Sequence, residues 1–242
     1  MKIICIGRNY TDHIEELANE RPEEPVVFLK PDTAILLHKQ PFFIPPWTDD
    51  VHHEVEVVVK INRIGKHIDE KFAHKYYDEI GLGIDFTARD VQQKLKQKGL
   101  PWEKAKAFDG AAVICRDFIN KSELPELDNL DFQLFKNGVL QQDGNTSHML
   151  WKIDAIIAYV SQYFTLKIGD LIYTGTPVPA LPQRCCVSAR ARRGSPRRHP
   201  RDASGFRRQG RCGRPNAPAA GNHRASRCRS RRPAARLRGR AG

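Results

Sequence analysis

Three acidic residues, Glu54, Glu56 and Asp85, are the leading candidates for chemistry in this 242-residue sequence. Glu54 and Glu56 open a run rich in β-branched residues, and side chains two positions apart on a strand share one face. Asp85 ends another apolar run. Carboxylate oxygens suit Mg²⁺ or Mn²⁺, and the absence of cysteine here argues against structural zinc. The spacing therefore indicates a divalent-metal site, or alternatively a solvated edge strand beside a helix-entry residue.

His13 and Glu16 form a second candidate pair. Asp12, with Glu15 three residues later, is typical of a helix start, and the helix is expected to run to about Asn19. An imidazole oriented by a carboxylate one turn away can act as a general base for water. The alternative is an exposed pair with no chemical role.

Four further side chains could hold an anionic substrate, although each could equally be an ordinary surface residue. They are Lys30, Arg89, Gln92 and Lys106.

The elements that would position these residues follow from apolar patterning and turn signals. Strands are predicted over residues 2–7, 26–30, 54–61, 77–85 and 171–173, with short extended pieces at 35–38 and 42–44. Thr87 is the expected cap of a helix that stops at Gly99, and Asn137-Gly138 predicts a hairpin joining residues 132–135 to 139–142. Apolar residues at helical spacing predict a helix over 152–163. The irregular, strand-rich order favours an α+β fold over a doubly wound sheet.

Charge divides the chain at Pro177. Residues 1–177 contain 21 Lys and Arg against 27 Asp and Glu, whereas residues 178–242 contain 19 Arg, no Lys and one Asp. The second part is dominated by Arg, Ala, Pro and Gly and contains no Ile, Met, Trp or Tyr. Because it can bury little apolar surface, we expect a disordered tail after a catalytic domain of residues 1–177.

Other compositional signals favour a cytoplasmic protein without a membrane anchor. Only Cys5 and Cys115 lie in the first part, so no disulfide framework is expected. Arg8 and Asp12 interrupt the N-terminal apolar run too early for a signal peptide, and no stretch approaches the roughly 18 apolar residues of a membrane span.

Ordered motifs across residues 1–177 resemble the fumarylacetoacetate hydrolase family, especially its short single-domain branch of acylpyruvate hydrolases, oxaloacetate decarboxylases and related isomerases. These motifs are Gly7-Arg8-Asn9-Tyr10 with His13 and Glu16, Phe28-Leu29-Lys30-Pro31, His53-Glu54-Val55-Glu56, Asp85-Phe86-Thr87-Ala88-Arg89-Asp90 with Gln92, residues 102–106, Gln142-Asp143-Gly144-Asn145-Thr146, and Gly169-Asp170 through Thr174-Gly175-Thr176-Pro177.

The resemblance implies a mixed, β-rich roll that forms a homodimer, with an incomplete C-terminus here. It implies that Glu54, Glu56 and Asp85 bind Mg²⁺ or Mn²⁺, that His13 and Glu16 activate water, and that Lys106 lies near the metal. Lys30, Arg89, Gln92 and Thr176 would face a small anionic 2-oxo acid.

The expected chemistry is cleavage of a C–C bond in a 2-oxo or 2,4-dioxo acid through a pyruvate enolate, which a metal ion stabilises. Acylpyruvate hydrolysis and oxaloacetate decarboxylation share that enolate. The sequence does not show which of these two reactions is preferred. An alternative is an isomerase or decarboxylase that uses the same site on dicarboxylates from the breakdown of aromatic compounds.

The family resemblance stops inside a motif, where the Arg-rich tail begins. We interpret the tail as the product of a frameshift near codon 178 that replaced the native C-terminus. The rival interpretation is a genuine basic arm that binds nucleic acid through its 19 Arg. A third interpretation is that loss of the native C-terminus leaves the chain unstable or inactive.

Overall fold

A computed structural model describes residues 1–11, 21–177 and 234–239. All of these residues belong to one compact unit of the chain. The predicted helix of residues 12–19, with His13 and Glu16, lies outside the described residues. Within the described ranges, no helix is long and apolar enough to cross a membrane.

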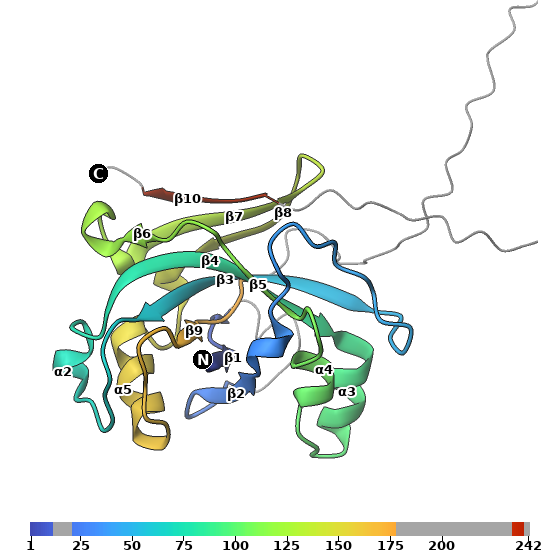
Figure 1. Cartoon of the computed structure of the whole chain (residues 1–242), viewed down its shortest axis with the longest axis horizontal. Coiled ribbons are helices and arrows are strands. Elements are labelled where there is room, and N and C mark those ends of the chain that lie inside the picture. Colours follow the sequence, from blue (N-terminus) through green and yellow to red (C-terminus); the bar gives the residue numbers. More distant parts are fainter. Residues whose placement is uncertain (12–20, 178–233, 240–242) are drawn as a thin grey trace, which may run out of the picture. The chain divides into compact units, whose positions relative to one another are not determined.

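A mixed sheet forms the centre of the described part of the chain (Figure 1). Its strand order is β2-β1-β9-β3-β4-β5, with β6 pairing to β4. Neighbours pair antiparallel except β1 and β9, which are parallel. The bounds are β1 (Ile3–Gly7), β2 (Val26–Lys30), β3 (Val51–Ile61), β4 (Tyr77–Ala88), β5 (Ala112–Ile114), β6 (Ile119–Asn120) and β9 (Leu171–Tyr173). This architecture confirms the α+β prediction.

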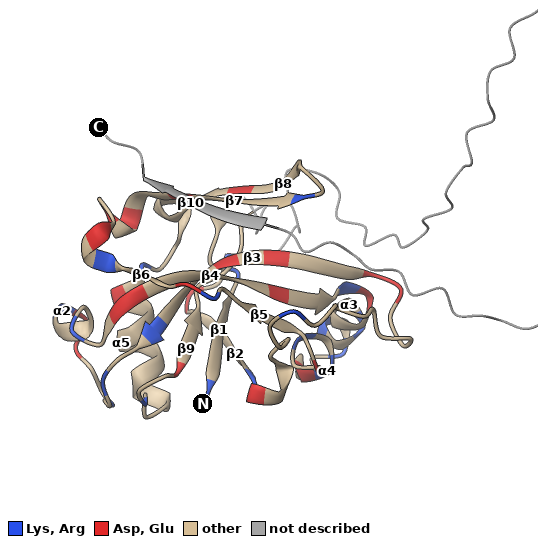
Figure 2. Cartoon of the chain, turned by 45° about the horizontal axis from the view of Figure 1, so that its top comes forward, with Lys and Arg blue, Asp and Glu red and all other residues tan. Residues whose placement is uncertain are grey.

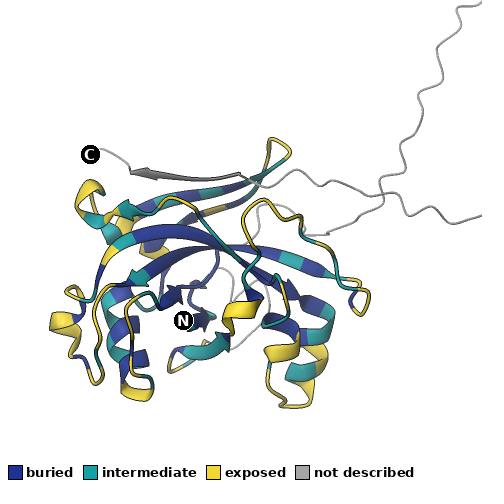
Figure 3. Cartoon of the chain, in the orientation of Figure 1, coloured by how far each residue is buried: buried dark blue, intermediate teal, exposed yellow. Residues whose placement is uncertain are grey.

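β3 and β4 are the longest strands, and both of their faces are covered. Val55, Val57 and Val59 pack with Ile80 and Ile84 in the main hydrophobic core. The opposite face of β3 contributes Val58 to a smaller cluster that includes Cys5 and Tyr173. Figure 3 shows β3 and β4 buried along most of their length. Polar residues on these strands therefore lie inside the protein, where each needs a partner.

A second, three-stranded sheet has the order β10-β7-β8. β7 (Leu130–Lys136) and β8 (Val139–Asn145) form the predicted hairpin. Asn137 and Gly138 have φ values of 54° and 83°, as a two-residue type I′ turn requires. β10 (Ala234–Gly239) comes from the Arg-rich tail and pairs antiparallel with β7. The rest of the tail that we expect to be disordered, residues 178–233 and 240–242, lies outside the described residues.

Helices lie at both ends of the β3–β4 pair (Figure 1). α3 (Arg89–Gln97) and α4 (Glu103–Lys106) lie at one end, and α2 (Glu70–Ala73) and α5 (Ile153–Tyr163) at the other. α5 confirms the predicted helix and buries Ile153, Ile156, Ile157 and Val160. Single 3-10 turns occur at Asp32–Ala34, Lys121–Glu123, Leu127–Asn129 and Thr146–His148.

One local prediction is wrong, and another gains no regular strand. Thr87 is not a helix cap: β4 continues to Ala88, and the Thr87 hydroxyl accepts a hydrogen bond from Lys106 instead. Residues 35–38 and 42–44 form no strand, and only Ile35 makes an isolated bridge, to Ala112. Phe42 stacks on Phe86 at a ring distance of 3.9 Å, so its apolar character reflects packing of a loop.

Candidate metal centre and anion pocket

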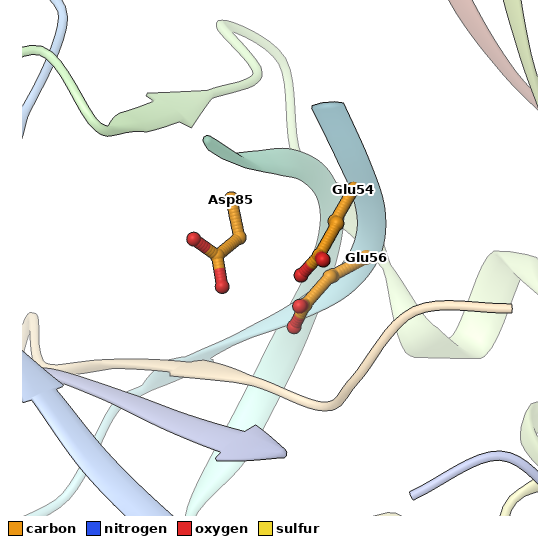
Figure 4. Close-up of side chains that lie close together, drawn as sticks. All are labelled: Glu54, Glu56 and Asp85. Carbon is orange, nitrogen blue, oxygen red and sulfur yellow. The ribbon is translucent and has the colours of Figure 1, made fainter. Parts of the chain in front are cut away.

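Strand register brings the three acidic residues together. Glu54 lies directly opposite Asp85 in the β3–β4 pair, and Glu56 follows two residues along the same face. Figure 4 shows the three carboxylates on adjacent strands. One oxygen from each carboxylate lies within 4.8 Å of the others, and the residues are only 4%, 2% and 0% exposed. The alternative of a solvated edge strand is therefore wrong, because β3 is an inner strand between β9 and β4.

Three buried cations pair with two of the three carboxylates, Glu54 and Asp85. Lys106 Nζ lies 2.7 Å from both Glu54 Oε2 and Asp85 Oδ2, and Lys30 Nζ lies 2.7 Å from Asp85 Oδ1. Arg89 donates a hydrogen bond to Glu54 Oε1. Figure 2 shows acidic positions within β3. Since unpaired buried charges are costly, this pairing is what allows such a cluster to exist inside the fold.

The cluster changes the proton affinities of its members. Burial alone would lower the pKa of Lys106, but Asp85 and Glu54 raise it above its ordinary value, so the ammonium keeps its proton. Burial, assisted by Asp85, raises the pKa of Glu56 well above its ordinary value, although Lys106 and a hydrogen bond from Gly175 oppose this. Glu56 is therefore an acceptor that a bound cation would stabilise strongly in its charged form.

Short helices place the cationic and amide side chains. α3 begins at Arg89, immediately after β4, and Gln92 lies one turn further on. Arg89 Nη1 donates to Gln92 Oε1 at 2.5 Å, and both residues are buried. α4 ends at Lys106, which places its ammonium over the β3–β4 pair.

The segment after β9 closes the site from the side of Glu56. Gly175 N donates to Glu56 Oε2 at 2.8 Å, and Thr176 Oγ1 donates to the carbonyl of Val55 at 2.9 Å. Gly175 has a φ of 101°, and a Cβ there would lie 2.9 Å from Asn9 Cβ. A glycine is needed because the backbone approaches its neighbours closely in a conformation that L side chains rarely adopt.

Gln142 is a site-supporting residue that sequence reasoning did not single out. Its Oε1 accepts from Val55 N at 2.8 Å, and its Nε2 donates to Thr176 Oγ1 at 2.9 Å and to the carbonyl of Pro177 at 3.0 Å. It therefore fixes the 174–177 segment against β3. The available signal was its place in the motif of residues 142–146. A glutamine in a hairpin strand does not by itself indicate that its partners are Val55 and Thr176, which lie far away in the sequence.

A pocket lies over the triad. Its lining includes Glu54, Glu56 and Asp85 together with the predicted residues Arg89, Gln92, Lys106 and Thr176. Arg8, Phe28, Lys96 and Trp102 also line it and were not predicted as site residues. Lys30 does not line the pocket; besides Asp85, it contacts the carbonyl oxygens of Lys106 and Ala111. His13 and Glu16 lie outside the described residues.

Comparison with known proteins places these residues in context. A family model described as "Fumarylacetoacetate (FAA) hydrolase C-terminal" matches residues 2–202, which extends 25 residues beyond Pro177. The bovine mitochondrial oxaloacetate tautomerase FAHD1 is 43% identical over 175 residues, 72% of this chain and 79% of the relative. The mitochondrial oxaloacetate decarboxylase of Dictyostelium discoideum is 42% identical over 177 residues, 73% of this chain and 81% of the relative.

Solved structures share the fold. Fumarylpyruvate hydrolase from Pseudomonas aeruginosa, in complex with Mn²⁺ and pyruvate, matches with a TM-score of 0.68 and 30% identity. The match covers 73% of this chain and 78% of that one.

Proposed function

The chain belongs to the fumarylacetoacetate hydrolase family, and from this premise we propose that it is a metal-dependent enzyme that acts on small 2-oxo or 2,4-dioxo acids through an enolate. The observation that carries the proposal is the buried carboxylate triad at the base of a pocket that also presents Arg89, Gln92 and Lys106. The relatives' names supply the candidate substrates, oxaloacetate and fumarylpyruvate.

Glu54, Glu56 and Asp85 fit a divalent cation and would hold Mg²⁺ or Mn²⁺. All three donors are carboxylate oxygens, which these hard cations prefer, and they converge within 4.8 Å. A cation bound there would be chelated by a 2-oxo acid and would neutralise the negative charge that develops on an enolate.

The chain's own cations would complete the charge balance around the substrate. Lys106 keeps its proton and lies within hydrogen-bond distance of two triad carboxylates, so its positive charge would stabilise negative charge on a substrate oxygen beside them. Arg89 and Gln92 share a hydrogen bond at the pocket wall, an arrangement that can orient a carboxylate or oxo group. Lys30, which lies outside the pocket lining, would neutralise part of the charge of Asp85.

Decarboxylation of oxaloacetate passes through the same pyruvate enolate as cleavage of an acylpyruvate, whereas tautomerisation passes through the enolate of oxaloacetate itself and breaks no C–C bond. Hydrolysis additionally needs an activated water, and we assign that task to His13, oriented by Glu16. Because decarboxylation needs no water attack, it should not require His13 or Glu16. We therefore favour oxaloacetate as the first substrate to test, with acylpyruvate hydrolysis as a second activity of the same site.

The test is turnover of oxaloacetate and of an acylpyruvate by the purified full chain, with Mn²⁺, with Mg²⁺ and after chelation of metal. We expect pyruvate release that requires the divalent ion. Glu56→Gln should reduce turnover steeply and weaken Mn²⁺ binding in calorimetric titration, since it removes one anionic donor. Metal-independent turnover, or equal Mn²⁺ affinity in both proteins, would show that the triad is not the metal site.

A further inference from the structure

Lys30 is a buried cation that contacts the triad from outside the pocket lining. It ends β2, and its side chain is 0% exposed. An ammonium group carries three N–H bonds. Those of Lys30 meet Asp85 Oδ1 at 2.7 Å, the carbonyl of Ala111 at 3.3 Å and the carbonyl of Lys106. Since all three donors have partners inside the protein, Lys30 has none left for a substrate.

The two oxygens of Asp85 have different partners. Oδ1 faces Lys30, whereas Oδ2 faces the ammonium of Lys106 at 2.7 Å. Because Lys106 lines the pocket and Lys30 does not, Oδ2 is the oxygen on the pocket side. A carboxylate oxygen can accept two bonds, so Oδ2 can bind a cation while Lys106 stays in place. Lys30 is itself fixed by two backbone carbonyls, and it therefore holds Oδ1 turned away from the pocket.

The other two carboxylates of the triad are divided in a similar way. Glu54 Oε1 accepts a hydrogen bond from Arg89. Glu56 Oε2 accepts one from Gly175 N at 2.8 Å. One oxygen of each triad member is thus held by the surrounding fold, which leaves one oxygen of each for a cation. Three single oxygens would fill half of the positions of an octahedral cation and leave the other half for a chelating 2-oxo acid and water.

We propose that Lys30 is a positioning residue that restricts Asp85 to binding the metal through one oxygen, and so keeps a coordination position open for substrate. The inference rests on the proposed function and concerns the same site. Without the Lys30 ammonium, Asp85 could turn both oxygens toward a divalent cation, because the ion pair that holds Oδ1 would be lost. The cation would then be bound more tightly and would have fewer positions for a substrate.

Lys30→Met tests this role by replacing the ammonium with an uncharged side chain of similar size. Calorimetric titration of the full chain should show Mn²⁺ binding at least about tenfold tighter than in wild type, since a positive charge beside a ligand is removed and an oxygen is gained. Turnover of oxaloacetate should nevertheless fall at least about tenfold, because the substrate loses a coordination position.

A merely structural role of Lys30 predicts the opposite change in metal binding. If the lysine only kept the site folded, a displaced Asp85 would bind Mn²⁺ more weakly in Lys30→Met. Unchanged or weaker Mn²⁺ binding in this variant would therefore overturn the inference.

Lys60→Met is the matched control. Lys60 on β3 pairs with Glu79 Oε2 on β4 at 2.6 Å, beyond the triad on the same two strands. The variant removes the same charge and also breaks a lysine–carboxylate pair, so its Mn²⁺ affinity should stay within about twofold of wild type. An equal gain in affinity in Lys60→Met would overturn the inference, because the gain would then be a general effect of charge.

The wild-type protein provides a measurement that does not depend on how well the variant folds. In crystals of the full chain grown with Mn²⁺, Asp85 Oδ2 should lie about 2.0–2.2 Å from the metal, and Oδ1 should remain bonded to Lys30. In Lys30→Met crystals both oxygens should approach the metal. Binding through both Asp85 oxygens in wild type would overturn the inference.

Oxaloacetate turnover by the wild-type protein distinguishes this inference from the proposed function. Turnover with Asp85 bound through both oxygens would contradict only the role of Lys30. One-oxygen binding that depends on Lys30, without turnover of oxaloacetate or acylpyruvate, would contradict the proposed function and leave that role standing.

Discussion

Lys106 connects the charges of the site at the scale of single residues. Its ammonium donates to Glu54, Asp85 and Thr87 at 2.6–2.7 Å, so one side chain links both strands of the β3–β4 pair. Two hydrogen bonds to carboxylates and one to a hydroxyl fix its position. A substrate oxygen bound beside the triad would therefore meet a positive charge whose position is already set, which lowers the reorganisation that catalysis requires.

His13→Ala separates the two reactions assigned to the site. Acylpyruvate hydrolysis should fall roughly 10²–10⁴-fold, as is typical for loss of a general base, because the proposal assigns activation of water to His13. Oxaloacetate decarboxylation should fall much less. The measurement is kcat/KM for both substrates with the same Mn²⁺-loaded protein.

Equal losses in the two reactions would show that His13 orders the site or binds substrate and does not activate water. Glu16→Gln provides the companion variant, and it should reproduce the selective loss more weakly if Glu16 orients the imidazole.

Residue types and spacing were enough to identify the triad, but not its surroundings. Alternation placed Glu54 and Glu56 on one face, and their joint burial with Asp85 agrees with that. Register, which a sequence pattern does not specify, determines that Asp85 faces Glu54. Arg8 and Lys96 were not predicted as site residues because neither belongs to an acidic or histidine cluster, and only the folded chain brings them to the same pocket.

At the scale of elements, the strongest local patterns were also the most reliable. The Asn137-Gly138 hairpin and the helix ending at Tyr163 follow from turn chemistry and 3.6-residue periodicity. Thr87 was misassigned because β4 runs three residues beyond Asp85, and a buried lysine uses its hydroxyl. Such a tertiary contact overrides a local capping preference and leaves no trace in local spacing.

Gly175 tests the link between backbone conformation and the site. Gly175→Ala should destabilise the protein by about 2–4 kcal/mol, because an unfavourable φ and a close approach to Asn9 act together. Gly99→Ala is the control: its φ is 63°, but no atom lies within 4 Å of the added Cβ, so only about 1–2 kcal/mol is expected. Urea unfolding measures both values. Equal losses would mean that the close approach contributes nothing.

Asp170 connects the start of β1 to the turn before β9. Its carboxylate accepts from Lys2 N at 2.8 Å, Lys2 Nζ at 2.5 Å and Lys167 N at 2.8 Å. Burial would raise the pKa of Asp170, but these hydrogen bonds lower it below its ordinary value. A carboxyl pKa that is lower in the folded state stabilises the fold above about pH 4, and this contribution is lost as pH falls through the folded-state value.

Asp170→Asn should therefore cost about 1–3 kcal/mol at pH 7, and its difference from wild type should shrink towards pH 3. Denaturant unfolding at several pH values checks this. A difference that stays constant with pH would show that the charge of Asp170 is not what stabilises the contact.

At the scale of the whole molecule, the Arg-rich tail is the feature that the site does not explain. Residues 178–242 carry 19 Arg, and the described residues among them form β10 on the edge of β7. We retain the proposal that a frameshift near codon 178 produced this tail. The family model matches as far as residue 202, and a frameshift at codon 178 has to be reconciled with that match. Sequencing the coding DNA in all frames tests the origin of the tail directly.

Three chains test what the tail does: the full sequence, residues 1–177, and residues 1–177 with a family-like ending. The restored chain should melt at the highest temperature and elute as a homodimer, since native strands would cover the sheet edge and part of the core. Removing residues 178–242 should give no rescue, because it exposes the β7 edge that β10 covers. If the full sequence melts cooperatively as a dimer at the temperature of the restored chain, the tail is no defect.

The basic-arm interpretation makes a different prediction. Retention on DNA should then weaken steeply with salt and vanish in the chain of residues 1–177. The absence of retention at low salt would exclude a nucleic-acid role for the tail.

The central claim is that Glu54, Glu56 and Asp85 bind a divalent metal, and anomalous diffraction from crystals grown with Mn²⁺ tests it most directly. We predict a single strong manganese peak at bonding distance, about 2.0–2.2 Å, from an oxygen of each of the three residues, and no such peak in Glu56→Gln. A peak elsewhere in the protein, or no peak while the Lys106 ammonium still bridges Glu54 and Asp85, would contradict the account.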